Sequence, residues 1–449
     1  MVDKNTPLKI TFDTPMEQSA VTASSIKVED DNGLVDVSFH SVDTADQTFT
    51  FTPDHELKGD VSITLGTAIK DADGDALAET QWHFRVPYWE IIGDDLSVDR
   101  PAGLEVTVAP DGTPYLAIKQ RAATGAASEA LIQRYNSNQG DWEKVGNLPG
   151  QPSLVGLQVG SDGIPRVARI KSTATRPLEV FQFDSNGNNW TSLGEANDET
   201  ETTMVITRFF ALDSNDVPYV AHVSDKTGTA NERRVRVSKY NAGTDSWEVL
   251  GGNTGNQYAS AGEVNFLVFA ISPNDIPYVA FRDEDESNDA LTVMKFTGND
   301  WDLVGARGFS GDTAGSIDLA FDQNNVPYVA FSDHQASRKA SVAKFNGTSW
   351  EFLGDRGFSI SPDRGSDIFL SIQLVLDSNN TPIIAAQNFG GDYKLVVRTF
   401  NGADWVNFAG VSHIDEQAQN ISMAIGPDNE LYVTYADKDT DKTKAQVFR

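Results

Sequence analysis

A repeated tryptophan–glycine motif is the feature of this chain that most limits its possible folds. Seven tryptophans recur between residues 89 and 405: Trp89, Trp142, Trp190, Trp247, Trp301, Trp350 and Trp405. Glycine follows four positions later in six copies, and Ala409 takes its place in the seventh. A repeat of this kind indicates that one structural unit is copied along the chain.

A second motif, P-Y-V-A in its commonest form, alternates with the first. Its copies begin at Pro114, Pro165, Pro218, Pro277, Pro327, Pro382 and Leu431. Each follows a short turn, mostly of Asn, Asp and Gly, which tolerate the positive φ of hairpins. A third, strand-like segment ending in Tyr or Phe comes after it. One repeat therefore reads as four short strands, with copies roughly 50 to 59 residues apart, a length that suits one propeller blade.

These repeats predict an all-β fold with a seven-bladed β-propeller over residues 87–449. The chain stops at Arg449, after the third strand of the seventh repeat, whereas a lone fourth-strand segment, 88–93, precedes the first repeat. We expect this N-terminal strand to complete the last blade and close the ring, which leaves no unpaired edge. The tryptophans are expected to pack between blades rather than to bind a ligand.

Residues 1–86 lack the repeat and predict a small Ig-like antiparallel β-sandwich. The segments P-L-K-I-T-F-D-T-P-M-E at 7–17, S-S-I-K-V-E-D-D-N-G at 24–33 and I-K-D-A-D-G-D-A-L-A at 69–78 resemble bacterial Ig-like domains of surface and secreted proteins. The P-Y-V-A and Trp repeat resembles uncharacterised repeats of secreted bacterial propeller proteins. The resemblance of the Trp repeat implies the propeller fold and export from the cell, but it implies no particular activity.

Composition excludes several classes of function. The net charge is −30, from 65 acidic and 35 basic residues, so the chain repels nucleic acid and anionic membranes. It has no cysteine, which excludes disulfides, thiolate catalysis and cysteine zinc sites. Neither a bilayer-spanning apolar run nor a signal peptide is apparent. We expect a mature or truncated chain, monomeric, and secreted or on the bacterial cell surface, with any signal or anchor outside it.

The acidic segment around Asp71, Asp73 and Asp75 raises the question of calcium. An EF-hand loop needs glycine at its sixth position and glutamate at its twelfth. Ala76 and Trp82 stand there, so we expect a polar turn and keep a weak calcium site as the alternative. No other metal site or cofactor is predicted.

The ends of the second strands are expected to ring the mouth of the channel, on the face with the more variable loops. The predicted ligand-binding residues are Lys119, Arg121, Arg169, Lys171, His222, Arg282, Asp283, Asp333, His334, Asn388 and Asp437. They are basic in the first two repeats and largely acidic on the opposite side.

No catalytic group stands out among these residues. Asp283 with Asp333 could form a glycosidase pair, but in a chain with 65 acidic residues such a pair is not informative. His222, His334 and His413 come from separate repeats, which makes a shared metal site unlikely. The sequence favours a non-enzymatic extracellular or cell-surface binding or adhesion module for a glycan or surface protein. The alternatives are a polysaccharide-active enzyme, lyase or glycoside hydrolase, at the same mouth, and a structural scaffold.

Overall fold

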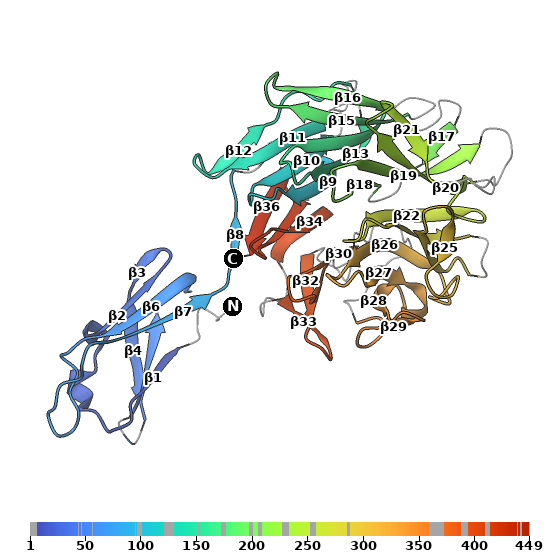
Figure 1. Ribbon diagram of the computed structural model, residues 1–449. Helices are drawn as coiled ribbons and strands as arrows, with labels where there is room; N and C mark the ends of the chain where they lie inside the picture. Colours follow the sequence, from blue (N-terminus) through green and yellow to red (C-terminus); the bar gives the residue numbers. More distant parts are fainter. Residues whose placement is uncertain are drawn as a thin grey trace. The chain divides into compact units, whose positions relative to one another are not determined.

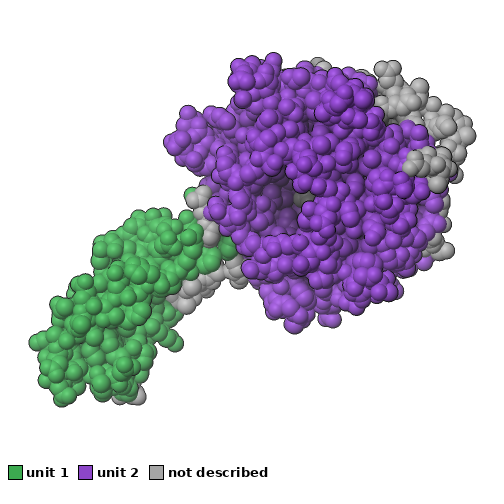
Figure 2. All heavy atoms as spheres, viewed as in Figure 1, with its two compact units in different colours: residues 1–90, 448–449 green, residues 91–447 purple. Residues whose placement is uncertain are grey.

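The structure is a computed structural model (Figure 1). It describes residues 7–43, 45, 47–55, 57–94, 96, 101–120, 130–150, 152–171, 177–196, 201–204, 209–226, 233–251, 257–284, 288–358, 372–387, 394–408, 414–437, 439–440 and 442–448. The chain divides into two compact units, shown in green and purple in Figure 2. Unit 1 is Met1–Glu90 with Phe448–Arg449, and unit 2 is Ile91–Val447.

Unit 1 contains two antiparallel sheets, as the sandwich prediction requires. One has the strand order β1-β5-β4 and the other β3-β2-β6-β7. The strands are β1 (Leu8–Thr11), β2 (Ile26–Asp30), β3 (Gly33–Val35), β4 (Val37–Val42), β5 (Thr48–Pro53), β6 (Gly59–Leu65) and β7 (Thr80–Val86), with short 3-10 helices η1 (Gln18–Ala20) and η2 (Ala23–Ser25). Alternate residues of β5 and β6, among them Phe49, Phe51 and Leu65, are fully buried in one core.

Unit 2 is built from repeated four-stranded antiparallel sheets. Repeat 1 consists of β9 (Pro101–Val108), β10 (Pro114–Gln120), β11 (Ala130–Asn136) and β12 (Asp141–Lys144). Repeat 2 consists of β13 (Pro152–Val159), β14 (Pro165–Lys171), β15 (Leu178–Asp184) and β16 (Asn189–Glu195). Repeat 3 consists of β17 (Glu201–Met204), β18 (Phe210–Leu212), β19 (Pro218–Lys226), β20 (Arg233–Asn241) and β21 (Ser246–Val249). In repeat 3 both β17 and β18 pair with β19.

The C-terminal repeats follow the same plan. Repeat 4 consists of β22 (Val264–Ile271), β23 (Pro277–Asp283), β24 (Leu291–Phe296) and β25 (Trp301–Leu303), and repeat 5 of β26 (Ala314–Phe321), β27 (Pro327–Asp333), η3 (His334–Ala336), β28 (Lys339–Phe345) and β29 (Trp350–Phe352). Repeat 6 consists of β30 (Ile372–Leu376), β31 (Pro382–Gln387), β32 (Lys394–Phe400) and β33 (Trp405–Asn407). Repeat 7 contains β34 (Ile414–Ile425), β35 (Leu431–Asp437) and β36 (Lys442–Phe448). Every P-Y-V-A motif is thus the second strand of its repeat.

The lone segment before the first repeat pairs with the last strand of the chain. The short strand β8 (Trp89–Ile91) lies next to β36 in the sheet order. Just beyond β8, the Ile92 N–H donates to the Ala445 carbonyl at 3.0 Å, and Leu96 forms an antiparallel bridge with Thr443. The start of unit 2 therefore lies beside the last strand of repeat 7.

Five of the tryptophan motifs are linked to the preceding motif through an indole hydrogen bond. The Trp190 Nε1–H donates to the Val145 carbonyl at 3.0 Å, and the acceptor is three residues after the preceding tryptophan. The same bond recurs from Trp142 to Ile92, Trp247 to Leu193, Trp350 to Val304 and Trp405 to Leu353. The Trp301 indole N–H has no partner among the described residues. These indoles therefore join repeats, in keeping with the expected packing role.

The glycine of the motif makes room for the next tryptophan. Gly305 has a φ of +78°, and a Cβ there would lie 2.9 Å from Trp350 Cδ1. Gly93 is tighter still, because a Cβ would lie 2.4 Å from Trp142 Cδ1. Real Cβ atoms do not approach other carbons this closely, so only glycine fits beside the incoming indole.

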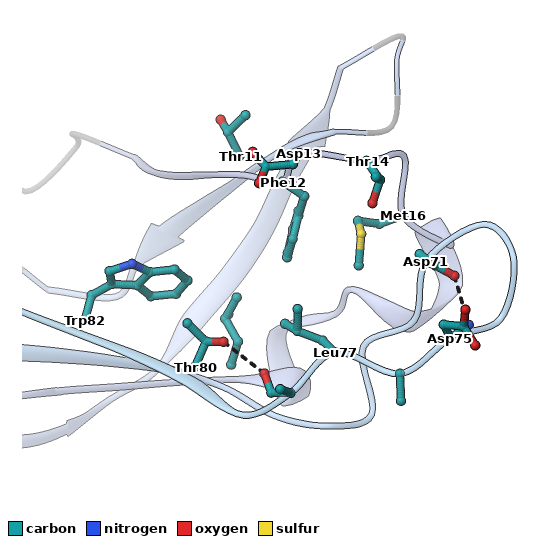
Figure 3. Close-up of a pocket in the computed structure, with 13 residues that line it drawn as sticks. Thr11, Phe12, Asp13, Thr14, Met16, Asp71, Asp75, Leu77, Thr80 and Trp82 are labelled. Atoms are coloured by element: carbon teal, nitrogen blue, oxygen red, sulfur yellow. Dashed lines mark hydrogen bonds between the residues drawn. The ribbon is translucent and has the colours of Figure 1, made fainter.

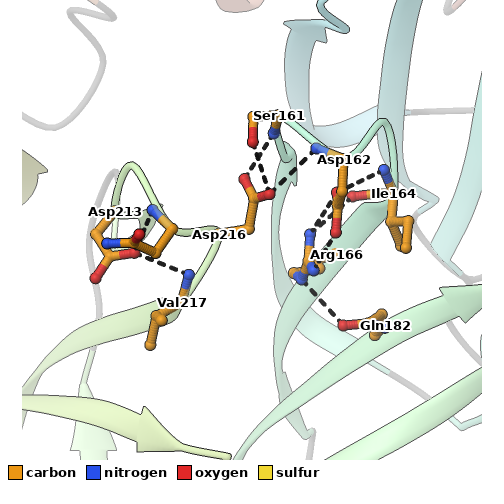
Figure 4. Close-up of polar contacts among 9 residues, drawn as sticks. Ser161, Asp162, Ile164, Arg166, Gln182, Asp213, Asp216 and Val217 are labelled. Carbon is orange, nitrogen blue, oxygen red and sulfur yellow. Dashed lines mark hydrogen bonds and ion pairs between the residues drawn. The ribbon is translucent and has the colours of Figure 1, made fainter.

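A second set of links joins neighbouring repeats at the turn between their first and second strands (Figure 4). The Asp216 carboxylate of repeat 3 accepts from the Ser161 backbone N–H at 2.6 Å, the Ser161 hydroxyl at 2.8 Å and the Asp162 N–H at 3.1 Å, all in repeat 2. Asp275 of repeat 4 binds Ser214 of repeat 3 in the same way. We call this contact the turn latch.

The turn latch depends on two positions, an acceptor in one turn and a backbone donor in the turn of the preceding repeat. Asn380 and Asn429 also accept from backbone N–H groups of the preceding repeat, at Gln323 and Ser378. The turns of repeats 1 and 2 have glycine at the acceptor position, Gly112 and Gly163, and the donor positions before them hold Pro427 and Pro110. Proline has no N–H to donate, so in those turns neither half of the latch is present.

Candidate functional site

Two of the predicted acidic residues are engaged in ion pairs inside their own repeats. Asp283, at the end of β23, is buried and receives both the Nε and Nη2 hydrogen bonds of Arg307, at 2.6 and 2.7 Å. Asp333, at the end of β27, is fully buried and binds Arg356 in the same two-pronged way. Each arginine follows the tryptophan motif of its repeat. A bidentate arginine fixes the orientation of a carboxylate, so these two aspartates hold the loops of Arg307 and Arg356 against the strand ends.

The predicted basic residues of repeat 2 are also neutralised. The buried Arg169 donates to Glu179 at 2.6 and 2.9 Å and lies over the Phe181 ring. Lys171 contacts the other oxygen of Glu179 at 2.6 Å, and this carboxylate raises the pKa of Lys171. Glu179 was not singled out in the sequence, although it faces Arg169 in the next strand.

The remaining predicted residues are distributed over several repeats. Asp437 accepts from the Asp439 N–H and the Thr440 hydroxyl and lies 3.4 Å from Lys444. His222 is buried in β19, His334 begins η3, and Lys119 is half-buried in β10. Arg121 and Asn388, together with His413, lie outside the described residues.

A pair of glutamates bridged by one arginine stands out at the same end of repeats 3 and 4. Arg233, the first residue of β20, donates from Nε to Glu263 at 2.6 Å and from Nη2 to Glu284 at 2.6 Å. Nη2 of Arg233 also forms an ion pair with Glu263. Because one nitrogen contacts both carboxylates, their nearest oxygens lie no more than about 5 Å apart, at or below the carboxyl separation of retaining glycosidases.

The two glutamates have different surroundings. Glu284 also accepts from Arg282 at 3.2 Å and from the Asn265 amide at 3.1 Å, so three side chains donate to it. Among the residues that the structure describes, one side chain, Arg233, donates to Glu263. Both glutamate side chains are 18% exposed, so solvent reaches them. We call Arg233, Glu263 and Glu284 with Asn265 and Arg282 the glutamate cluster.

Sequence reasoning chose one member of this cluster, Arg282, and missed its centre. Glu284 follows Arg282 and Asp283 directly at the end of β23 and was visible as part of that triplet. Arg233 and Glu263 come from separate segments, and no spacing in the sequence relates them to Glu284. Their meeting depends on the packing of β20 beside the start of β22.

The acidic segment of unit 1 forms a turn. Asp71 Oδ1 accepts from the Asp73 and Asp75 backbone N–H groups at 3.0 and 2.9 Å. A pocket of about 360 Å³ opens beside it, lined by residues that include Phe12, Met16 and Trp82 (Figure 3). Among the described residues, no group of three or more acidic or histidine side chains could hold a metal ion. Within the same residues, no helix is long and apolar enough to span a bilayer.

Comparison with known families identifies unit 1 but not unit 2. Residues 1–86 match the family described as "Bacterial Ig-like domain", in agreement with the predicted resemblance. No curated protein matches the chain. The predicted resemblance of the propeller repeat to an uncharacterised repeat family is not confirmed.

Several solved structures resemble the chain at low similarity. One is the β-propeller domain of the Trilobed protease from Pyrococcus furiosus, with 8% identity and a TM-score of 0.48, covering 80% of this chain and 96% of that one. Another is an α-L-arabinanase from Penicillium chrysogenum, with 13% identity and a TM-score of 0.46 over 80% and 98% of the two chains. A third is an α-L-arabinofuranosidase from Fusarium graminearum, with 13% identity and a TM-score of 0.43 over 81% and 98%.

These comparisons correct the leading interpretation of the sequence. A non-enzymatic binding or adhesion module was expected, yet glycoside-cleaving enzymes are among the similar structures. That expectation does not stand as the leading interpretation, and the enzyme alternative takes its place as a proposal. At such identities and TM-scores below 0.5, the likeness assigns no reaction or substrate to this chain, so the site has to be argued from its own residues.

Proposed function

We propose that unit 2 is a seven-bladed propeller whose ring is closed by β8. The first strands of the repeats support this, because they lie beside one another in the cyclic order β9, β13, β18, β22, β26, β30, β34 and again β9. The closing contact includes a hydrogen bond from the Val106 N–H of repeat 1 to the Ser422 hydroxyl of repeat 7, at 3.0 Å. Figure 2 shows a hollow in the face of unit 2, as expected for a central channel.

We propose that the protein is a polysaccharide-active enzyme, a glycoside hydrolase with the glutamate cluster as its active site. The observation that carries this proposal is the pair of glutamates, each 18% exposed, whose nearest oxygens one arginine holds no more than about 5 Å apart. Two carboxyl groups at this spacing can act as nucleophile and as acid and base on one glycosidic bond, with retention of configuration.

The surroundings of the glutamates assign their roles. Glu284, with donors from Arg233, Arg282 and Asn265, is held in one orientation, which suits the nucleophile. Glu263 has a single side-chain donor and is the proton donor to the leaving oxygen, and later the base that activates water. Arg233 keeps both groups in position until the sugar enters between them.

The other predicted mouth residues remain proposals as contacts to the glycan. Lys119 and Asp437 lie at or near the end of their second strands, like Arg282 of the cluster, whereas His222 lies in the middle of β19. A glycan substrate would be met outside the cell, so we also propose that the protein is secreted or displayed on a bacterial surface. The Ig-like match of unit 1 supports this location.

Release of new reducing ends from a panel of polysaccharides by the full chain tests the proposal. Glu284→Gln should remove activity on every substrate. Glu263→Gln should lower polysaccharide cleavage by about 10²–10⁴-fold, yet retain much of the activity on dinitrophenyl glycosides, whose leaving groups need no protonation.

Glu248→Gln is the matched control, because Glu248 is an exposed glutamate of β21 outside the cluster. It should cleave like the wild type. Cleavage that survives both cluster substitutions would contradict the site, and unsaturated products would indicate a lyase instead. A wild-type chain inactive on every polysaccharide and aryl glycoside would contradict the enzyme itself.

A further inference from the structure

A pocket of about 420 Å³ lies between repeats 4 and 5, at the end of the sheets that carries the turn latches. Its polar lining comes from Tyr278, Lys295, Asn325, Lys344 and Asn346. The glutamate cluster lies at the other end of the strands, since Glu284 follows the last residue of β23 whereas Tyr278 is its second. The pocket is therefore a separate feature from the proposed active site.

Neighbouring repeats show how the same positions are normally filled. In repeat 3, Lys239 lies over the Tyr219 ring and 3.6 Å from the Asp213 carboxylate, which also accepts from the Tyr219 hydroxyl at 3.3 Å. In repeat 5, Lys344 lies over Tyr328 in the same way and 3.9 Å from Asp322. A buried aspartate thus compensates the lysine in both repeats.

Repeat 4 keeps the tyrosine and the lysine but lacks the acid. Ser272 stands where the other two repeats have Asp213 and Asp322. Lys295 has no ion-pair partner among the described residues, although Asp302 lies opposite it on β25. The Tyr278 hydroxyl makes no hydrogen bond to them either, and burial raises the pKa of Tyr278, so the hydroxyl stays a donor at neutral pH.

The turn latch is also broken at this pocket. Asn325 of repeat 5 has a φ of +64° and occupies the acceptor position, like Asp275 one repeat earlier. The donor position in repeat 4 holds Pro273, which has no N–H. The Asn325 Oδ1 is consequently buried and has no donor among the described residues. A buried acceptor left unpaired is costly and calls for a ligand or water.

We propose that this pocket binds a carboxylate-bearing saccharide, such as a uronate unit of an acidic polysaccharide. The carboxylate lies between Lys295 and Lys344 and accepts from the Tyr278 hydroxyl. A sugar hydroxyl donates to Asn325 Oδ1, which needs a hydrogen-bond donor. A simple anion such as sulfate has no hydrogen to donate and does not meet this requirement. The inference stands independently of the glutamate cluster, because it uses none of its residues.

Charge makes this pocket unusual on the molecule. The chain carries a net charge of −30, so its surface as a whole repels acidic glycans. Lys295 is left without the compensating aspartate of its neighbours, and Asp322 lies no nearer than 3.9 Å to Lys344. Salt screens the attraction between this positively charged pocket and an anionic ligand, so binding should weaken as ionic strength rises.

Calorimetric titration of the full chain with trigalacturonate tests the inference. Wild type should bind saturably, and Lys295→Ala should weaken binding at least tenfold. Ser272→Asp with Pro273→Ser restores both the aspartate and the latch donor of the neighbouring repeats, so the protein's own groups fill the site and binding should disappear. Lys239→Ala removes the equivalent lysine of repeat 3 and should bind like wild type.

Three outcomes would overturn the inference. The first is the absence of saturable binding to wild type. The second is equal binding by wild type and Lys295→Ala. This single substitution of a half-buried lysine keeps the test valid if the double variant fails to fold. The third is equal binding of neutral galactotriose, or of inorganic sulfate, which would reduce the site to a neutral-sugar or a simple anion site. Loss of polysaccharide cleavage in Glu284→Gln with binding retained separates this site from the proposed active site.

Discussion

The glycine of the tryptophan motif provides a sharp test of how the repeats are joined. Gly305 and Gly347 both have positive φ, +78° and +96°. A Cβ at Gly347 would meet nothing within 4 Å, whereas one at Gly305 would lie 2.9 Å from Trp350 Cδ1 and 3.1 Å from its Nε1. Alanine at either position has positive-φ strain, so the two substitutions differ mainly in the contacts at Gly305, with Trp350 and, at 3.2 Å, with Phe345 Cε2.

Their expected costs follow from this geometry. The left-handed backbone costs alanine about 1–2 kcal/mol at both sites, and overpacking adds about 1–3 kcal/mol at Gly305 alone. Gly347→Ala should therefore lower the free energy of unfolding by about 1–2 kcal/mol and Gly305→Ala by about 2–5 kcal/mol. The effect of glycine on the unfolded chain is common to both variants and cancels in the difference.

Urea unfolding followed by circular dichroism measures the two changes, and Trp350→Phe completes a double-mutant cycle. In the Trp350→Phe background the Gly305→Ala cost should fall by about 1 kcal/mol or more, because the indole edge is gone. The reasoning would be refuted if Gly305→Ala and Gly347→Ala lowered the free energy of unfolding equally. It would also be refuted if the effect of Gly305→Ala were the same in the wild-type and Trp350→Phe backgrounds.

Three further predictions concern single contacts. Trp190→Phe removes the hydrogen bond to the Val145 carbonyl and should cost about 1–3 kcal/mol in thermal or urea unfolding, since that carbonyl is left unpaired. Asp216→Ala opens one turn latch and should increase amide hydrogen exchange at Ser161 and Asp162, with little change in repeats 5 to 7. Burial raises the pKa of Asp437, but Thr440, the Asp439 N–H and Lys444 outweigh burial and lower the pKa below its usual value. The ionised Asp437 therefore stabilises the fold above about pH 4, and this contribution is lost as the pH falls through the lowered pKa. Asp437→Asn should make the free energy of unfolding less dependent on pH in the acid range.

Much of the fold could be predicted because each pattern is repeated along the chain. A P-Y-V-A motif after a turn marks the second strand in every repeat, and the tryptophan marks the edge strand. The pairing of the 88–93 segment with the end of the chain followed from a count: one repeat lacked a fourth strand, and one such strand was left over. The family match of residues 1–86 agrees with motifs read directly from the sequence.

The candidate site was less accessible, because side-chain partners depend on packing that no repeat encodes. Asp283 and Asp333 were recognised as chemically interesting, but their partners, Arg307 and Arg356, lie 24 and 23 residues away in loops that fold back on the strand. The centre of the glutamate cluster joins residues 30 and 51 positions apart. By contrast, the acid missing from repeat 4 could have been found by aligning Ser272 with Asp213 and Asp322.

The most direct test of the closed ring is a disulfide between positions 96 and 443. Leu96 and Thr443 face each other in an antiparallel bridge, a geometry within reach of a disulfide, and the chain contains no other cysteine. Oxidised Leu96→Cys/Thr443→Cys should yield one cross-linked peptide by mass spectrometry, whereas Leu96→Cys/Lys442→Cys, with the second side chain on the opposite face, should not. Free thiols in the first variant, or equal cross-linking in both, would contradict a ring sealed by its own first strand.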